Sequence, residues 1–235
     1  MIFNNIDMCD YFTANDVRRD ILPPVAVATK AIPGRVGERF IKRNLGMGII
    51  EVDITVEGFL LSEMREKVRE IAGILNTDEE KQLIFSDEPD KYYMAILNGD
   101  TRLKEIVSVG EGMLTFLCPD PLAYSLDAVT ASLANKVYNG GTAEATGVIT
   151  VNVTDSVDYV QAKLKSTGEI VRIGDDFVAG DTVIINLAQE HAEKNGHSIM
   201  AKVALASDFF DLPTGEFEIE VTGGTGTLEF RERWL

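Results

Sequence analysis

The sequence predicts a mainly β protein in two parts, the first of which contains one substantial helix. Apolar and polar residues alternate strictly from Ile50 to Glu57, the period of a strand with one buried and one wet face. Helical spacing follows directly after this strand. In the C-terminal half, short Val- and Ile-rich segments separated by turn residues recur about every 8–12 residues, as in an antiparallel sandwich or barrel.

The composition predicts a globular and acidic protein. The 235 residues are 45% hydrophobic, so a core can be buried, and 38 acidic against 22 basic side chains give a net charge of −16. Residues 1–124 hold 21 acidic and 14 basic side chains, so the acidity is spread along the chain. Such a surface repels polyphosphate, which argues against a nucleic-acid binder but is compatible with DNA passing close by without sticking.

The cysteines and the N-terminus indicate a protein of the cytoplasm. Cys9 and Cys118 are too few for a disulfide framework and show no CxxC spacing, so we expect two free, largely buried thiols. Residues 1–12 lack the basic region and long apolar run of a signal peptide. No segment approaches the roughly 20 apolar residues of a membrane helix. We therefore expect the chain to be made, and to fold, in a cytoplasm.

A basic stretch from Lys30 to Arg43 departs from the acidity of the rest. Pro33, Gly34 and Gly37 mark it as an extended loop or arm that leads into the alternating strand. A basic arm on an acidic protein can bind an acidic surface of another subunit, although a solvated loop is equally compatible with these residues alone. The candidate subunit-contact residues are Lys30, Arg35, Arg39, Lys42 and Arg43, against the single acid Glu38.

The helix is predicted over residues 62–75. Apolar residues fall at helical spacing between Met64 and Leu75. Ser62 is the expected N-cap, because its hydroxyl can accept a hydrogen bond from an orphan N–H of the first turn. Residues 76–78 end the helix, which we expect to pack on a sheet.

Two hairpins are predicted after the helix. Their strands and turns are 81–85, 86–90 and 92–97, then 106–109, 110–112 and 113–118. Pro119 and Pro121 stop regular structure, because proline cannot donate to a β-ladder. We place the end of the first domain, residues 1–124, near Tyr124 and expect residues 125–141 to be a connection.

The second domain is predicted to span residues 142–235 as an antiparallel β-sandwich. Gly168, Gly174 and Gly180 supply turns between its strands. Residues 187–195 are ambiguous between a strand and one helical turn. The expected strands are 147–153, 158–164, 169–173, 182–187, 198–206, 216–221 and 227–231.

The sequence supplies poor material for catalysis or for a metal site. His191 and His197 have no Cys or Asp at a ligand spacing, so we expect two surface histidines of one loop. Asp175-Asp176 is expected in a turn, and the alternating acids from Glu216 to Glu220 on the wet face of a strand. Residues 223–226 lack the lysine of a phosphate loop and are expected to form a hairpin turn. We predict no enzymatic activity, no cofactor and no metal.

A series of short motifs runs through the chain. They are Ile32-Pro33-Gly34-Arg35-Val36-Gly37, the alternating strand and its helix, Phe116 to Tyr124 (FLCPDPLAY), Asn139 to Thr142 (NGGT), Gly180 to Ile185 (GDTVII), Phe210 to Gly215 (FDLPTG) and Phe230 to Leu235 (FRERWL). In this order, and covering nearly the whole chain, they resemble the motifs of the distal tail proteins of long-tailed, non-contractile bacteriophages and prophages. Each motif alone is weak, so it is their order that carries the resemblance.

The resemblance implies an N-terminal β-sandwich with a helix and an arm, followed by a C-terminal galectin-like β-sandwich. It implies a homohexameric ring at the virion tail tip, assembled in the bacterial host cytoplasm. Such a ring joins the tail tube protein to the tail hub and to receptor-binding proteins, with no membrane partner, and leaves a channel for DNA. An acidic lining would let DNA slide through that channel without binding.

Two other interpretations stay open on the sequence. A carbohydrate-binding or glycan-processing protein would use the C-terminal sandwich, although a galectin-like fold need not bind sugar. The single tryptophan, Trp234, lies in the closing strand that the resemblance implies for Phe230 to Leu235, where core packing accounts for it. A tail tube protein would also be β-rich and ring-forming, but the two-domain length and the CPDP junction at residues 118–121 favour the distal protein.

Overall fold

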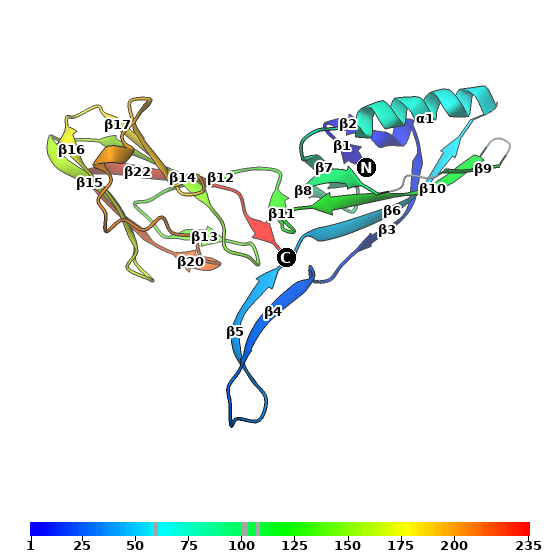
Figure 1. Cartoon of the computed structure of the whole chain (residues 1–235). Helices are drawn as coiled ribbons and strands as arrows, with labels where there is room; N and C mark the ends of the chain where they lie inside the picture. Colours follow the sequence, from blue (N-terminus) through cyan, green and yellow to red (C-terminus); the bar gives the residue numbers. More distant parts are fainter. Residues whose placement is uncertain (59–60, 100–102, 107–108) are drawn as a thin grey trace. The chain divides into compact units, whose positions relative to one another are not determined.

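The computed structural model describes residues 1–58, 61–99, 103–106 and 109–235, which divide into two compact units (Figure 1). Unit 1 comprises Met1–Ala123 together with Leu235, and unit 2 comprises Tyr124–Trp234. Both are built from antiparallel sheets, and α1 (Leu61–Leu75) is the one α-helix of the described residues. The predicted mainly β fold is confirmed.

Unit 1 is organised around a sheet with the strand order β2-β1-β7-β8-β10-β6-β3, to which β9 adds beside part of β10. Strand β8 pairs with β7 over residues 88–95 and with β10 over residues 96–98, so it joins the two halves of the sheet. The bounds are β1 (Ile2–Phe3), β2 (Ile6–Asp7), the 3-10 turn η1 (Met8–Asp10), β3 (Thr13–Arg19), β6 (Gly48–Glu57), β7 (Lys81–Phe85), β8 (Glu88–Asn98), β9 (Leu103–Ile106) and β10 (Val109–Cys118).

Strands β6 and β10 form a ten-residue antiparallel ladder that runs from Gly48 opposite Cys118 to Glu57 opposite Val109. The predicted alternation is confirmed, since the apolar residues Ile50 to Val56 are buried and the residues between them are partly open. The ladder therefore presents one dry face to the core and one wet face to solvent, as an antiparallel sheet with a period of two residues does.

Helix α1 packs on the dry face of this sheet (Figure 1). Met64, Ile71 and Leu75 are buried there, which confirms the predicted apolar stripe. The helix begins at Leu61, so Ser62 lies inside the first turn and the predicted N-cap is wrong. The spacing of apolar residues predicts that a helix packs on the sheet, but it does not determine the first residue of the helix, because the first turn contains few of the buried apolar residues.

The core of unit 1 packs the N-terminal strands against the ladder. The rings of Phe3 and Phe116 are fully buried, with centroids 5.5 Å apart. Cys118 is buried as predicted, and its burial raises the pKa of the thiol to about 12. Cys9 is exposed, contrary to the prediction, because it lies in the surface turn η1.

The turns of unit 1 differ from those predicted. Strands β7 and β8 close around residues 86–87, so Pro89 lies inside β8 and not in the turn. The predicted turn at residues 110–112 is wrong, because these residues lie within β10 and pair with β6 on one side and β9 on the other. Ladder pairing on both sides stabilises glycines that local propensity would assign to a turn. Residues 107 and 108, part of the predicted strand 106–109, lie outside the described residues.

Unit 2 is the predicted β-sandwich. One sheet has the order β12-β22-β14-β17-β18-β19, and β16-β15-β21 and the pair β13-β20 form the other layer. Inward side chains of both layers, among them Ile149, Val160 and Ile185, share one apolar cluster. The bounds are β11 (Ala123–Ser125), β12 (Val129–Ser132), β13 (Val137–Asn139), β14 (Gly147–Val153), β15 (Val157–Leu164), β16 (Ile170–Phe177), β17 (Thr182–Asn186), β18 (His191–Lys194), β19 (His197–Ser198), the 3-10 turn η2 (Met200–Lys202), β20 (Gly215–Phe217), β21 (Ile219–Thr222), β22 (Gly224–Phe230) and β23 (Arg233–Trp234).

Three local predictions in this part of the chain are wrong. Residues 125–141, expected to be a connection, contain β12 and β13, which pair with β22 and β20. Of residues 198–206, expected to be one strand, Ser198 ends β19 and the rest form η2 and a loop along β16, where Ala204 N donates to the Arg172 carbonyl at 2.8 Å. Gly223, with a φ of +97°, carries the chain from one sheet to the other, so β21 and β22 are no hairpin. In each case the conformation is determined by pairing with a strand that is distant in the sequence, and local sequence patterns do not reveal such pairing.

Substituting Phe116→Ala should destabilise unit 1 by about 3–5 kcal/mol, because a fully buried ring is replaced by a cavity. The matched control is Phe40→Ala, whose ring is 60% exposed and whose loss should change stability by no more than about 0.5 kcal/mol. Urea denaturation of both variants at a concentration where the protein is monomeric measures the difference. Equal effects of the two substitutions would contradict the packing described here.

Candidate assembly surface

The described residues contain no group of three or more His, Cys, Asp or Glu side chains placed to hold a metal ion. His191 begins β18 and His197 begins β19, and His191 Nε2 lies 3.5 Å from a carboxylate oxygen of Glu193. The two histidines thus belong to adjacent strands of a surface hairpin, where one loop was predicted. Within the same part of the chain, no helix has the length and apolar character needed to cross a membrane.

Three of the carboxylates considered for catalysis, Asp175, Glu216 and Glu218, take part in ion pairs. Asp175 lies in β16, and not in the predicted turn, with carboxylate oxygens 3.1 Å from Lys194 Nζ and 3.3 Å from Lys202 Nζ. The hydrogen bond from Lys194 is the main reason that the pKa of Asp175 is lowered. Glu218 similarly lies 2.5 Å from Lys165 Nζ. A carboxylate held in its charged form by an ammonium is poorly suited to act as a general acid.

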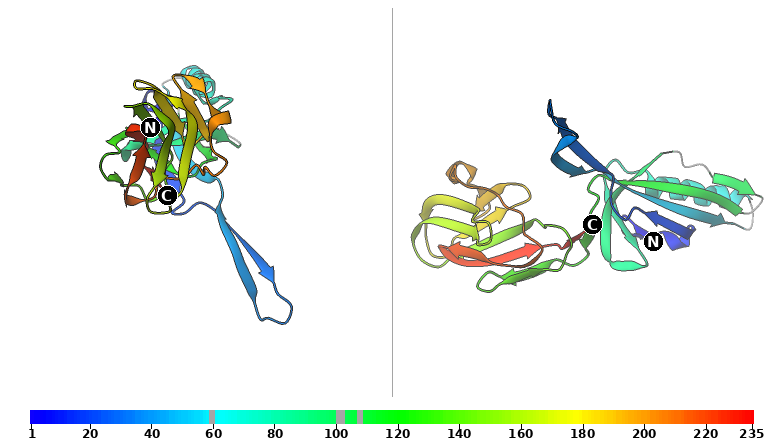
Figure 2. Two further views of the ribbon diagram at one scale, coloured as in Figure 1. Left: turned by 90° about the vertical axis from the view of Figure 1, so that its left-hand side faces the viewer. Right: turned by 90° about the horizontal axis from the view of Figure 1, so that it is seen from below.

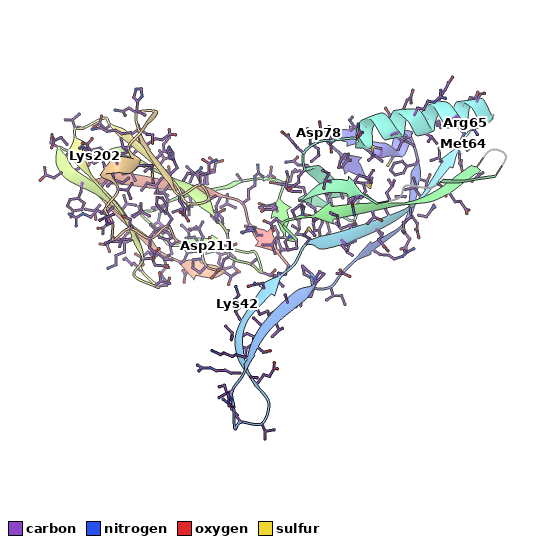
Figure 3. The ribbon with its side chains drawn as sticks, in the orientation of Figure 1. Lys42, Met64, Arg65, Asp78, Lys202 and Asp211 are labelled. Atoms are coloured by element: carbon purple, nitrogen blue, oxygen red, sulfur yellow. The ribbon has the colours of Figure 1, made fainter. Side chains whose placement is uncertain are left out.

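The basic stretch forms a β-hairpin that stands apart from the body of unit 1 (Figures 1 and 2). We call residues 25–45 the arm. Its strands, β4 (Val25–Ala31) and β5 (Glu38–Leu45), make a two-stranded sheet of their own, and almost every residue in them is exposed. The arm holds all five predicted contact residues, with Lys30 on β4, Arg35 in the turn, and Arg39, Lys42 (Figure 3) and Arg43 on β5.

The register of the arm separates its side chains onto two faces, because cross-strand partners lie on the same face. Ile41 is a bulge residue between the pairs Ala28–Lys42 and Thr29–Phe40. The apolar face carries Val25, Val27, Thr29, Ala31, Phe40 and Leu45, together with Glu38 and Arg43. The basic face carries Ala26, Ala28, Lys30, Arg39, Lys42 and Asn44. Three of the five predicted cations therefore share one face, and Arg43 lies on the other.

The exposed apolar side chains of the arm were not predicted from the sequence, because only the charges of the arm were considered. Val27 is 56% exposed, Phe40 60% and Ile41 55%. The sequence does contain the signal, since Val25 and Val27 alternate with alanines in a strand-like pattern. Large apolar side chains gathered on a protruding hairpin mark an interaction surface more often than an inert loop.

Arg19, the last residue of β3, fixes the root of the arm to the body of unit 1. Its guanidinium donates to both carboxylate oxygens of Asp87, at 2.8 and 3.0 Å, and to Glu88 at 2.9 Å. The same guanidinium lies over the Phe85 ring, 4.3 Å from its centroid. The β7–β8 turn thereby holds the chain where it leaves the sheet for the arm. Sequence patterns give no sign of this clamp, because its partners are 68 and 69 residues away.

The Arg19 clamp also shifts the titration of its partner. The hydrogen bond from Arg19 is the main reason that the pKa of Asp87 lies below its ordinary value of 3.8. A carboxyl group whose pKa is lower in the folded state stabilises the fold fully at pH values above its unfolded-state pKa of 3.8. This stabilisation is lost as the pH falls through the lower pKa of the folded state. The clamp is therefore intact at every pH above about 4.

The wet face of the β3–β6–β10 sheet is polar and acidic. Arg18 on β3 lies 3.2 Å from Glu51 on β6, 3.3 Å from Asp16, and also pairs with Asp53. The Asp53 carboxylate is the main reason that the pKa of Arg18 is raised. We call this surface the open face, with the acids Asp16, Glu51, Asp53, Glu57 and Glu111 against the cation Arg18.

Replacing Arg19→Gln should loosen the root of the arm by about 1 kcal/mol, the value of a partly exposed ion pair, because Asp87 and Glu88 lose their shared donor. Amide hydrogen exchange at Gly46, whose N–H donates to the Pro24 carbonyl at the root of the arm, should then quicken roughly fivefold. Arg18→Gln is the matched control, since the neighbouring side chain pairs with acids of the open face and not with the β7–β8 turn. Equal quickening in both variants would show that the clamp does not hold the arm.

Known proteins resemble this chain along its whole length. Residues 6–118 match the family of the phage tail protein RIFT-related domain, and residues 140–234 match the C-terminal domain of the siphovirus-type tail component. The distal tail protein of Bacillus phage SPP1 is 25% identical over 242 residues, which cover 100% of this chain and 95% of that protein.

The fold is shared as well. The crystal structure of the SPP1 Dit protein, described as a paradigm of the hub adsorption apparatus in phages that infect Gram-positive bacteria, superposes with a TM-score of 0.88 at 24% identity. The superposition covers 100% of this chain and 98% of that one. Two consecutive family domains and a relative of similar length thus agree in order and extent with the motifs read from the sequence. The chain belongs to the siphovirus distal tail protein family.

Proposed function

We propose that this protein is a structural part of the virion tail tip that closes into a homohexameric ring. The ring joins the tail tube protein to the hub and to receptor-binding proteins, and it leaves a channel for DNA. The observation that carries the proposal is the likeness to a distal tail protein over 100% of the chain, including both family domains. Synthesis and assembly take place in the bacterial host cytoplasm.

The arm is the proposed subunit contact. It holds five basic residues and one acid in a chain whose net charge is −16, so any other copy presents it with an attractive surface. Lys30, Arg35, Arg39, Lys42 and Arg43 supply this attraction. The surface that receives the arm differs from the arm itself, so the contact is heterologous, and a heterologous contact repeated by rotation closes into a ring.

The open face is the proposed lining of the DNA channel. Among the side chains that the structure describes on this sheet surface, the acids outnumber the cation Arg18. A polyanion that passes such a surface keeps its counterions, because too few cations of the protein are present to displace them, and it is therefore not retained. The opposite face of the same sheet is covered by the core and α1, so it cannot line the channel.

Light scattering behind size exclusion, with negative-stain imaging of the same peak, tests the ring. We expect a species of six copies with a central hole, from the purified protein or after addition of its tail tube and hub partners. A protein that stays monomeric at high concentration and binds none of these partners would contradict the proposal. Glycan binding by that monomer would then support the carbohydrate-binding alternative.

Reversing charge on the open face should convert it from a surface that DNA passes to one that holds DNA. We expect the assembled Glu51→Lys/Glu111→Lys variant to retain duplex DNA at low salt and to release it as salt is raised, whereas the wild-type assembly retains none. The matched control is Glu220→Lys, an exposed strand position in unit 2. Equal retention by the control and the open-face variant would rule out this lining.

A further inference from the structure

We infer that the apolar face of the arm docks in the groove between α1 and the sheet of unit 1 in a second copy of this chain. The inference rests on the proposed ring and names both sides of its subunit contact. It also moves the main binding role from the five cations to the apolar side chains beside them.

The apolar face of the arm is suited to be buried. Val27 and Phe40 are more than half exposed, and Val25 and Leu45 are 38% and 39% exposed at the base of the same face. Aromatic and aliphatic side chains that become fully covered supply most of the affinity of protein interfaces. A hairpin with exposed apolar side chains and two unpaired strand edges is an aggregation hazard unless a specific partner covers it.

Unit 1 has an apolar groove that can receive such a face. The groove has a volume of about 590 Å³ and lies along α1, whose Val68, Ala72 and Leu75 form one wall. Val56, Leu97 and Leu114 of the sheet form its floor. Ala72 is exposed although it lies beside the core, because nothing in the described residues covers this flank of the helix.

A buried polar group at the end of the groove also points to an absent partner. The Oγ1 atom of Thr77 is buried and has no hydrogen-bond partner among the described residues. Thr77 belongs to the lining of the groove. A buried hydroxyl without a partner is costly, whereas the free edge of a two-stranded ribbon such as the arm offers backbone N–H and C=O groups.

The lengths and charges of the two surfaces agree. Fifteen residues of α1 span about 22 Å, and the eight residues of β5 span about 26 Å. On the groove side, Arg69 lies one helical turn before Ala72 on the same flank, and Asp78 (Figure 3) follows the end of the helix. The apolar face of the arm carries Glu38 toward the tip and Arg43 toward the base.

These charges fix the direction in which the arm lies. Glu38 should lie near Arg69, and Arg43 near Asp78, because the reverse direction would place like charges together. In a closed ring each arm then fills the groove of the next copy, so no apolar face is left uncovered.

The cations of the basic face take a different role. Lys30, Arg39 and Lys42 point away from the groove when the apolar face is buried in it. Charges at the rim of an interface mainly speed the encounter and make it sensitive to salt. Removing these three cations should therefore slow assembly at low salt but leave the assembled state intact.

Cross-linking between copies tests the position of the arm. In a Cys9→Ser background, which removes the exposed native thiol, Val27→Cys and Ala72→Cys are made as separate proteins and mixed. On mild oxidation with diamide we expect a disulfide-linked dimer from the mixture and none from either variant alone. The matched control replaces Ala72→Cys by Thr13→Cys, an exposed position on β3 of the same unit. Cross-linking to residue 13 in place of residue 72 would overturn the docking site.

Two sets of substitutions test the contacts themselves. Val27→Ser/Phe40→Ser should raise the concentration needed for assembly roughly 100-fold, whereas Lys30→Gln/Arg39→Gln/Lys42→Gln should leave it within about threefold. Arg43→Glu and Asp78→Lys should each weaken assembly, and the double variant should restore it. All of these positions are exposed, so the variants fold. A double variant as weak as the single variants would contradict the pairing.

The outcome separates this inference from the proposed function. A wild-type protein that forms rings, but whose Val27→Cys and Ala72→Cys variants never cross-link, overturns the docking site and leaves the ring standing. A wild-type protein that forms no ring, with or without its tail partners, overturns both.

Discussion

The ten-residue ladder between β6 and β10 is the constraint on which the rest of unit 1 depends. Because its side chains alternate, one ladder supplies a dry face for the Phe3–Phe116 core and for α1, and a wet face that carries the acids. A shift of register by one residue would exchange the two faces and bury Glu51 and Asp53, so the register is strongly determined. The proposed channel lining and the proposed docking groove are thus opposite sides of the same sheet.

The arm depends on this ladder as well, because it continues the two strands β3 and β6 beyond the edge of the sheet. Pro23 and Pro24 interrupt the pairing on one side, and Gly46 N donates to the Pro24 carbonyl at 2.7 Å on the other. The Arg19 clamp holds the last ladder residue before this break. The arm is therefore anchored at its root and open along its length, which suits a segment that waits for a neighbouring copy.

Much of this architecture could be predicted from the sequence, because it follows from local periodicity. The alternation from Ile50 to Val56 and the stripe from Met64 to Leu75 mark a strand and a helix wherever they occur. Gly110, the loop after β19 and Gly223 were misplaced because pairing with distant strands decides their conformation. At the arm, charge identified the right segment, but the division into faces depends on the register and on the bulge at Ile41. The Arg19 clamp depends on partners that no local pattern reveals.

The central claim is that the arm joins copies of the chain into a ring whose lumen is formed by the acidic open face. A cryo-electron microscopy reconstruction of the assembled protein tests this most directly, because it shows both surfaces at once. The account predicts six copies, each with its arm lying on the neighbouring unit 1 and with Glu51 and Asp53 facing the lumen. Arms that end free in solvent, or an open face turned toward the outside of the ring, would contradict it.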